Sequence, residues 1–257
     1  MQGRKKEGKE LKLKLNMNLR GRAAIVTGGS SGIGQAICGQ LAGEGTKIIF
    51  TYNSNEAGAD ETLKILGKGN FKYKVDIRNE TEIEKFFAFV KQKFGKIDIL
   101  VNNAGKTLRG DNLDIGLWRE VFDITLFPAV KFTQEALKIM SKGKILNISS
   151  VYGEDKAAWK GLVPFSAAKS ALNNFTVTMA KNLAPNILVN GIMPGYVLTP
   201  LWGKMNEDKI KSNSSEQLIN RFIKPEEIAT MAVAIIKNDA MTGEVVVVDG
   251  GLSLKTV

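Results

Sequence analysis

The stretch VPFSAAKSA, residues 163–171, places a lysine one helical turn after an aromatic ring. Phe165 and Lys169 are four positions apart, so their side chains share one face of a predicted helix. An aromatic ring and a lysine in this arrangement suggest a pair that transfers a proton. Phe165 has no hydroxyl, however, so the pattern predicts a catalytic helix that lacks its proton donor.

The composition excludes several classes of active site. The sequence contains no histidine, so Ser-His-Asp triads, Cys-His pairs and imidazole zinc sites are excluded. The single cysteine, Cys38, excludes a thiolate zinc site and an intrachain disulfide, and its apolar surroundings predict a buried packing residue. We therefore expect no metal, and proton chemistry must come from Tyr, Lys, Asp, Glu, Ser or water.

A glycine-rich turn, TGGSSGIGQAI over residues 27–37, follows an apolar run and opens a helical one. Gly28 allows a tight turn, Gly32 lets the backbone approach a pyrophosphate, and Gly34 lets the helix pack closely on the sheet. The start of that helix offers free N–H groups and a partial positive charge to an anion. The turn therefore predicts a dinucleotide-phosphate site.

Short β-branched runs alternate with longer amphipathic runs from Arg22 onward, and the short runs are almost continuously apolar. This alternation predicts one α/β domain over residues 17–257, a Rossmann-type doubly wound parallel sheet of about seven strands. Residues 195–222 are predicted to form a loop that covers a ligand, and Pro128 is expected to kink its helix. The predicted strands are 23–27, 47–51, 72–76, 98–102, 144–149, 187–191 and 244–249, and the predicted helices begin near Ile33, Ser54 and Glu80 or span about 118–140, 165–183 and 225–237.

The N-terminal residues 1–16 carry six basic and two acidic side chains, part of a formal net charge of +10. We interpret them as a flexible, solvated extension, or as an upstream start ahead of Met17. We prefer this to an arm that binds nucleic acid or an anionic surface, and to an edge strand formed by the alternating LKLKLNMNL. No long apolar run predicts a membrane span, and no apolar stretch follows the charged terminus as in a signal peptide. We therefore expect a cytoplasmic protein.

Further motifs follow the glycine turn in a fixed order, and together they resemble the short-chain dehydrogenase/reductase family over residues 17–257. The turn itself is spaced Gly-x-x-x-Gly-x-Gly. Within this family, the sequence resembles 3-oxoacyl-(acyl carrier protein) reductases and sugar dehydrogenases. The other motifs are Asp76 at a strand end, NNAG (102–105), NISS (147–150), VNGIMPG (189–195) and VDGG (248–251).

The resemblance implies that NAD(H) or NADP(H) binds at this turn and at the neighbouring strand ends. Asp76 would reach the adenine, and Asn102 the ribose side. Lys169 would hold the nicotinamide ribose and Thr199 the carboxamide end. Asp76 could instead cap a strand end. The residues implied to bind the cofactor are Gly28, Ser31, Gly32, Ile33, Gly34, Asn53, Asp76, Asn102, Lys169 and Thr199.

The choice between the two cofactors depends on the end of the second predicted strand. A carboxylate there would bind the ribose 2′-OH and repel a 2′-phosphate. Tyr52, Asn53 and Ser54 stand at this point, so the strand end has neither a carboxylate nor an arginine. These polar side chains and the positive charge of the chain slightly favour NADP(H) over NAD(H).

In this family a serine polarises the carbonyl, a tyrosine exchanges the proton, a lysine lowers the pKa of that tyrosine, and an asparagine supports them. The resemblance assigns Ser150 and Lys169 to the serine and the lysine. Phe165 stands at the tyrosine position and Thr125 at the asparagine position. Two of four positions therefore depart from the pattern, and the activity is expected to be weak or absent.

Three explanations of Phe165 stay open. A tyrosine was replaced in an ordinary reductase, or the chain is a pseudoenzyme that binds the cofactor as a partner or regulatory subunit, or another group supplies the proton. Tyr152 is two residues after Ser150, and we interpret it as a pocket wall rather than a proton donor. Tyr196 is the second residue assigned to the substrate pocket.

The resulting prediction is an NAD(P)(H)-dependent oxidoreductase that acts on a small carbonyl or alcohol substrate. The resemblance also implies a homodimer or homotetramer, and no nucleic acid or membrane is expected as a partner.

Overall fold

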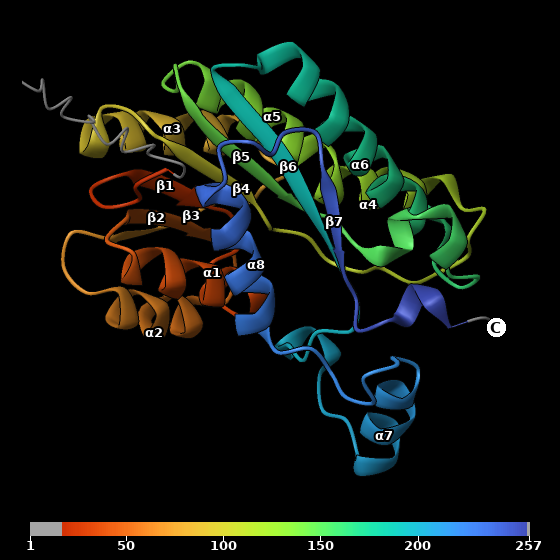
Figure 1. Cartoon of the computed structure of the whole chain (residues 1–257). Coiled ribbons are helices and arrows are strands. Elements are labelled where there is room, and N and C mark those ends of the chain that lie inside the picture. Colours follow the sequence, from red (N-terminus) through yellow and green to blue (C-terminus); the bar gives the residue numbers. More distant parts are fainter. Residues whose placement is uncertain (1–16, 256–257) are drawn as a thin grey trace, which may run out of the picture.

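Seven parallel strands form one sheet in the order β3-β2-β1-β4-β5-β6-β7 (Figure 1). The computed structural model describes residues 17–255, so the predicted extension over residues 1–16 lies outside the described residues. The strands are β1 (Ala23–Val26), β2 (Lys47–Tyr52), β3 (Phe71–Lys74), β4 (Ile99–Asn102), β5 (Gly143–Ile148), β6 (Ile187–Pro194) and β7 (Val245–Val248).

The order of the strands reverses at β1, which pairs with β2 on one side and with β4 on the other. The chain winds outward from β1 to β3, then returns to the centre and winds the other way to β7. A ligand crevice is expected at the carboxyl ends of the strands at such a switch point. The predicted doubly wound fold is therefore confirmed, and it locates the site beyond Val26 and Asn102.

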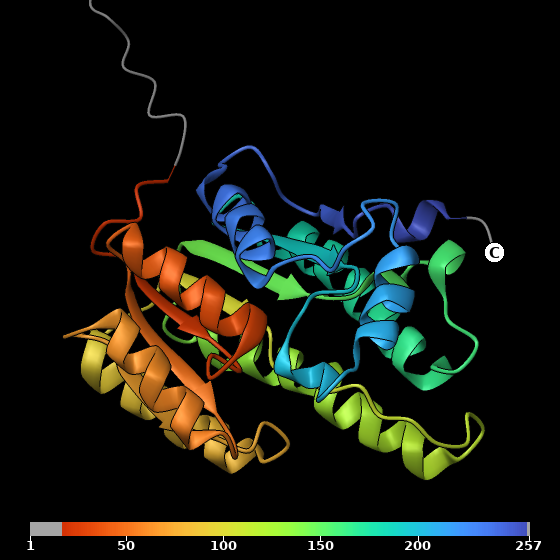
Figure 2. The same cartoon turned by 90° about the horizontal axis from the view of Figure 1, so that it is seen from below.

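Helices cover both faces of the sheet (Figure 2). α1 and α8 pack on one face, while α3, α5 and α6 pack on the other. None of the helices within residues 17–255 is both long and apolar enough to cross a bilayer. The helices are α1 (Gly32–Gly43), α2 (Glu56–Leu66), α3 (Glu80–Phe94), α4 (Ile115–Thr125), α5 (Phe127–Leu137), α6 (Val163–Leu183), α7 (Glu207–Ser215) and α8 (Pro225–Lys237).

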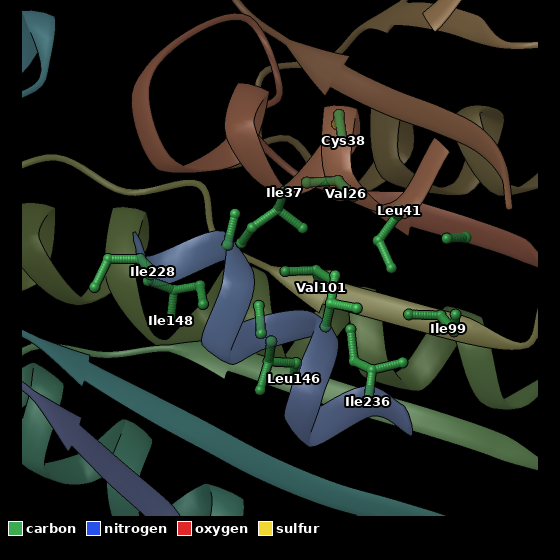
Figure 3. Packing of buried hydrophobic residues seen from close by; sticks show 14 of the residues in the cluster. Val26, Ile37, Cys38, Leu41, Ile99, Val101, Leu146, Ile148, Ile228 and Ile236 are labelled. Carbon is green, nitrogen blue, oxygen red and sulfur yellow. The ribbon is translucent and has the colours of Figure 1, made fainter. Parts of the chain in front are cut away.

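The core between the sheet and the pair α1–α8 is built from side chains at helical spacing (Figure 3). Ile37 and Leu41 of α1 and Ile228 of α8 are fully buried against the sheet, on the face that includes Val101. Cys38 is also fully buried, and burial raises the pKa of its thiol. The interpretation of Cys38 as a packing residue is therefore confirmed.

The helix predicted over residues 118–140 is in fact two helices. α4 ends at Thr125 and α5 begins at Phe127, with Leu126 between them and Pro128 in the first turn of α5. Proline lacks an N–H and is tolerated in a first turn, where no intrahelical bond is lost. Pro128 therefore lies at the start of a second helix, whereas a kink within one helix was predicted.

The predicted loop over residues 195–222 contains α7, so this part of the prediction was wrong. The side chain of Asn206 accepts from the N–H of Lys209, and Glu207 and Asp208 occupy the first turn. A capping asparagine followed by two acids is a helix-start signal. It was missed because α7 buries none of its residues and so lacks an apolar stripe. Figure 1 shows α7 set apart from the sheet.

We predict that Phe86→Ala destabilises the fold by about 3–5 kcal/mol, because it removes a fully buried ring from an aromatic cluster. The Phe86 ring packs against Tyr73 and Phe132 with centroid distances of 5.4 and 5.8 Å. The matched control is Phe127→Ala, whose ring is 54% exposed and should cost less than about 1 kcal/mol. Urea unfolding measures both values, and equal losses would contradict the assignment of the core.

Candidate active site

Hydrogen bonds of Thr27 and Asn103 connect the ends of β1 and β4 at the switch point. Thr27 Oγ1 accepts from the N–H groups of Asn103 and Ala104, both at 2.9 Å. The side chain of Asn103 donates to the carbonyl oxygens of Thr27 and Gly28 at 2.9 and 3.2 Å. These bonds fix the glycine turn against the NNAG segment. Asn103 was not singled out from the sequence, although two consecutive asparagines in the NNAG segment were a visible signal.

The glycine turn lies so close to its neighbours that side chains would not fit. A Cβ on Gly34 would overlap the carbonyl oxygen of Gly28, and one on Gly32 would lie 3.0 Å from Thr199 Cγ2. Gly28 and Gly32 also have positive φ values of 67° and 55°. The structure therefore brings Thr199, from beyond β6, directly against the turn.

The start of α1 leaves backbone donors free. Ser31 is the N-cap, but its side chain makes no capping bond, whereas asparagine or aspartate side chains cap α2, α3, α4 and α7. Within residues 17–255, the N–H groups of Gly32, Ile33 and Gly34 find no acceptor. Uncapped donors at a helix start suit a phosphate, so this turn fits a dinucleotide by its own geometry.

Ser150 and Lys169 meet at the carboxyl end of β5. Lys169 Nζ donates to the carbonyl oxygen of Ile148 at 2.8 Å, and Ser149 Oγ donates to the carbonyl oxygen of Lys169 at 3.2 Å. Ser150 Oγ accepts from the N–H of Tyr152 at 3.2 Å, which holds the hydroxyl at the start of the short helix Val151–Gly153. The predicted serine and lysine are therefore neighbours across one strand end.

Lys169 is a buried charge without a carboxylate partner among residues 17–255. Burial lowers the pKa of its ammonium to about 8, because desolvation disfavours the charged form. Its Nζ lies 5.8 Å from the centroid of the Phe165 ring, close enough for a cation–π contact. The helix thus juxtaposes the two residues as predicted, with a phenyl ring facing the ammonium.

Thr125 and Asn102 line a small cavity together with Lys169. Asn102 Nδ2 donates to Asn147 Oδ1 at 2.9 Å, while Asn102 Oδ1 and Thr125 Oγ1 are buried without a partner. Two unpartnered oxygens and an ammonium make the cavity polar and suited to an ordered water. The structure therefore brings Asn102 and Thr125 to Lys169, and Asn103 rather than Asn102 contacts the glycine turn.

The predicted adenine end contains charged groups that already have partners. Asp76 accepts from Arg78 Nη2 at 2.6 Å, and this hydrogen bond lowers the pKa of its carboxyl. Asn53 is exposed beyond β2. The Tyr52 hydroxyl donates to Glu56 Oε1 at 3.2 Å, which places a carboxylate near the end of β2. Glu56 was missed because it lies in the first turn of α2, not on the strand.

The two predicted pocket residues are in direct contact. Tyr152 Oη lies 2.6 Å from Tyr196 Oη, and Tyr196 Oη lies 2.6 Å from Glu216 Oε2. Burial, followed by the bond to Glu216, raises the pKa of Tyr196. Trp202 packs on Tyr196 with a centroid distance of 5.1 Å, and Trp159 packs on Tyr152 at 5.9 Å. An aromatic wall therefore borders the site beside Ser150.

Comparison with known proteins agrees with this geometry. A family model described as short chain dehydrogenase matches residues 22–210. The chain belongs to this family. The resemblance of its motifs to the short-chain dehydrogenase/reductase family is therefore confirmed.

Three relatives show how far the similarity of this short-chain dehydrogenase extends. The 3-oxoacyl-(acyl-carrier-protein) reductase FabG of Aquifex aeolicus is 37% identical over 253 residues, covering 93% of this chain and 100% of that protein. A diacetyl reductase ((S)-acetoin forming) of Staphylococcus epidermidis is 32% identical, with 90% and 98% covered. The crystal structure of a point variant of actinorhodin polyketide ketoreductase with NADPH superimposes with a TM-score of 0.85 at 30% identity, covering 91% of this chain and 98% of that one.

We predict that Gly34→Ala weakens NADPH and NADH binding at least tenfold, or about 1.4 kcal/mol. Its Cβ would overlap the Gly28 carbonyl oxygen and lie 2.5 Å from Asn103 Nδ2, which displaces α1 from the turn. The control is Gly39→Ala in the same helix, where a Cβ meets nothing within 4 Å. Fluorescence titration compares the variants, and unchanged cofactor binding by Gly34→Ala would contradict a phosphate site at the glycine turn.

We predict that Lys169→Met stabilises the cofactor-free protein at pH 7 by up to about 3 kcal/mol, the value that the pKa difference implies. The pKa of Lys169 is about 8 in the fold and 10.5 by reference, so the unfolded chain binds the proton more tightly. The free energy of unfolding of the wild type therefore rises as the pH increases from about 8 to 10.5. The difference in stability between the wild type and Lys169→Met becomes smaller over this range. Urea unfolding at pH 7 and pH 10 tests this, and a constant deficit would count against it.

Proposed function

We propose that this short-chain dehydrogenase/reductase interconverts a carbonyl and an alcohol with NAD(P)(H), in the manner of a 3-oxoacyl reductase. The observation that carries the proposal is the arrangement of the uncapped start of α1, Ser150 and Lys169 at adjoining strand ends. The relatives support the reaction class, since they include a 3-oxoacyl-(acyl-carrier-protein) reductase and a diacetyl reductase.

The residues around the glycine turn would hold the cofactor, which supplies or accepts a hydride when bound. The free N–H groups of Gly32, Ile33 and Gly34 bind the pyrophosphate, and Thr199 closes the turn from the opposite side. Lys169 binds the nicotinamide ribose, and Asp76 the adenine side. Gly28, Ser31, Asn53 and Asn102 complete the proposed set.

Ser150 and Lys169 would prepare the reacting oxygen. Ser150 Oγ accepts from a backbone N–H, so its own hydrogen is oriented away and can be donated to a carbonyl oxygen. Lys169 supplies positive charge near that oxygen. Phe165 can supply no proton, and a missing general acid costs on the order of 10²–10⁴ in rate. That factor corresponds to roughly 3–5 kcal/mol of barrier, which is why slow turnover is proposed.

NADP(H) is proposed as the slightly preferred cofactor. The solved ketoreductase contains NADPH, and Lys72 lies 5.3 Å from the centroid of the Tyr52 ring at the end of β2. Glu56, which accepts from Tyr52, opposes this preference by repelling a 2′-phosphate. Lys72 also pairs with Glu56 and Asp60 and so neutralises part of this negative charge.

A catalytically silent cofactor-binding protein, acting as a partner or regulatory subunit, is the second candidate. Phe165 and Thr125 favour it, since both remove groups that the family uses. A cytoplasmic homodimer or homotetramer is also proposed. Its support is apolar exposure on α5, where Phe127 is 54% and Val130 39% exposed.

We predict that Phe165→Tyr raises kcat at least tenfold while leaving cofactor affinity unchanged, because it places a phenol one helical turn before Lys169. Phe175→Tyr on the same helix is the control and should change neither value. NADPH oxidation and NADH oxidation with a panel of β-ketoacyl, quinone and sugar substrates measure the rates. Failure of wild type and Phe165→Tyr to bind either cofactor would disprove the proposed function.

A further inference from the structure

Three side chains beside the site form a hydrogen-bonded chain that the proposed roles of Ser150 and Lys169 do not use. Tyr152, Tyr196 and Glu216 are joined by two oxygen–oxygen distances of 2.6 Å. A carboxylate only accepts hydrogen bonds, so Tyr196 donates to Glu216 and must itself accept from Tyr152. The chain therefore has a direction, from the site toward a carboxylate, and its short contacts suit proton transfer.

The inner end of the chain lies beside the residues of the active site. The N–H of Tyr152 donates to Ser150 Oγ, and its ring packs against the buried cluster that includes Phe165. The following carbonyl, that of Gly153, accepts from Asn173 of α6 at 3.1 Å. Because the Tyr152 hydrogen is directed to Tyr196, the lone pairs of Tyr152 Oη remain available to a substrate hydroxyl.

The outer end of the chain is held by a dedicated anchor. Gln217 is fully buried, and its side chain accepts from the N–H of Tyr196 at 3.0 Å and donates to the carbonyl oxygens of Tyr196 and Arg221 at 3.3 and 2.6 Å. This grip fixes the neighbouring Glu216 opposite the Tyr196 phenol. Glu216 is only partly buried, so its carboxylate can exchange protons with water.

We propose that Tyr152 exchanges the reaction's proton with the substrate oxygen and that Tyr196 and Glu216 relay it to solvent. The inference rests on the proposed function and concerns the step that Phe165 cannot perform. The relay replaces a donor on α6 with one on the short helix Val151–Gly153.

The transfers balance in both directions. In alcohol oxidation the substrate hydroxyl proton moves to Tyr152 Oη, the Tyr152 proton to Tyr196, and the Tyr196 proton to Glu216. A bound oxidised nicotinamide cofactor would accept the carbon–hydrogen electron pair as hydride, which leaves the substrate as the carbonyl. Carbonyl reduction runs the same transfers backwards and requires Glu216 to begin protonated. Burial raises the pKa of Tyr152 most, and the hydrogen bond to Tyr196 lowers it. Of the charged groups that act on Tyr152, Glu216 raises its pKa and Arg109 lowers it.

The first test is kinetic and compares Tyr152→Phe, Tyr196→Phe and Glu216→Gln with the controls Tyr73→Phe and Glu207→Gln. Tyr152→Phe should lower kcat about 100-fold with an unchanged cofactor Kd. Tyr196→Phe and Glu216→Gln should each lower kcat for alcohol oxidation about tenfold, because each interrupts the path of the proton to the terminal base Glu216. Addition of Phe165→Tyr to Tyr152→Phe should restore turnover, which a merely structural role of Tyr152 would not allow.

The second test needs neither cofactor nor substrate. Glu216→Gln removes the carboxylate charge that helps to raise the pKa of Tyr196, so one tyrosine should ionise at lower pH in an ultraviolet titration. Glu207→Gln, at the far end of α7, should leave the titration unchanged. A Glu216→Gln titration identical to wild type would overturn the relay.

Further results separate the relay from the proposed function. Turnover by Tyr152→Phe at the wild-type rate would overturn the relay alone. The relay alone would also be overturned if the wild type bound cofactor without turnover while Phe165→Tyr turned over. Absence of NADPH and NADH binding to the wild type would instead overturn the proposed function.

Discussion

The contact between Gly34 and the carbonyl oxygen of Gly28 is the constraint on which the site depends. It lets α1 begin directly beside the end of β1, at a distance that any Cβ would prevent. The first N–H groups of the helix are then presented at the switch point, where β4 also ends. Asn103 reinforces this arrangement, because its side chain binds the carbonyl oxygens of Thr27 and Gly28. The close packing of α1 on the end of β1 thus also determines where the first N–H groups of α1 are presented.

Phe165 keeps most of what a tyrosine would contribute to the fold. Its ring is 8% exposed, belongs to a buried cluster with Val121 and Ala168, and faces the ammonium of Lys169. These packing and cation–π contacts involve the ring, not a hydroxyl. A phenyl ring at this position therefore offers no exchangeable proton, while it packs as the architecture of the helix requires. Lys169 remains a buried ammonium, whose desolvation disfavours the cofactor-free fold.

The sheet could be predicted from the sequence because its strands are buried on both faces and carry unbroken apolar runs. β5 is a clear case, since all six of its residues are buried. The glycine turn and the helical spacing of Phe165 and Lys169 were equally visible, because both depend on local geometry. The boundary between α4 and α5 needed the more specific knowledge that Pro128 suits a helix start.

Contacts made across the fold could not be predicted in this way. The bonds of Tyr196 to Tyr152 and Glu216 join residues 44 and 20 positions apart, and no local pattern encodes them. The unpartnered oxygens of Asn102 and Thr125 likewise become visible only when β4 and α4 are placed together. α7 escaped prediction for a different reason, since a helix that buries no residue has no periodicity to detect.

That independence of α7 from the core has an evolutionary consequence. Its side chains can drift in size and polarity at little expense to folding, provided that Gln217 keeps its hold on the backbone of Tyr196. Gene duplication followed by changes confined to this appendage would alter the surface around Glu216 while the sheet stays untouched. Change and stability are thereby assigned to separate parts of the chain.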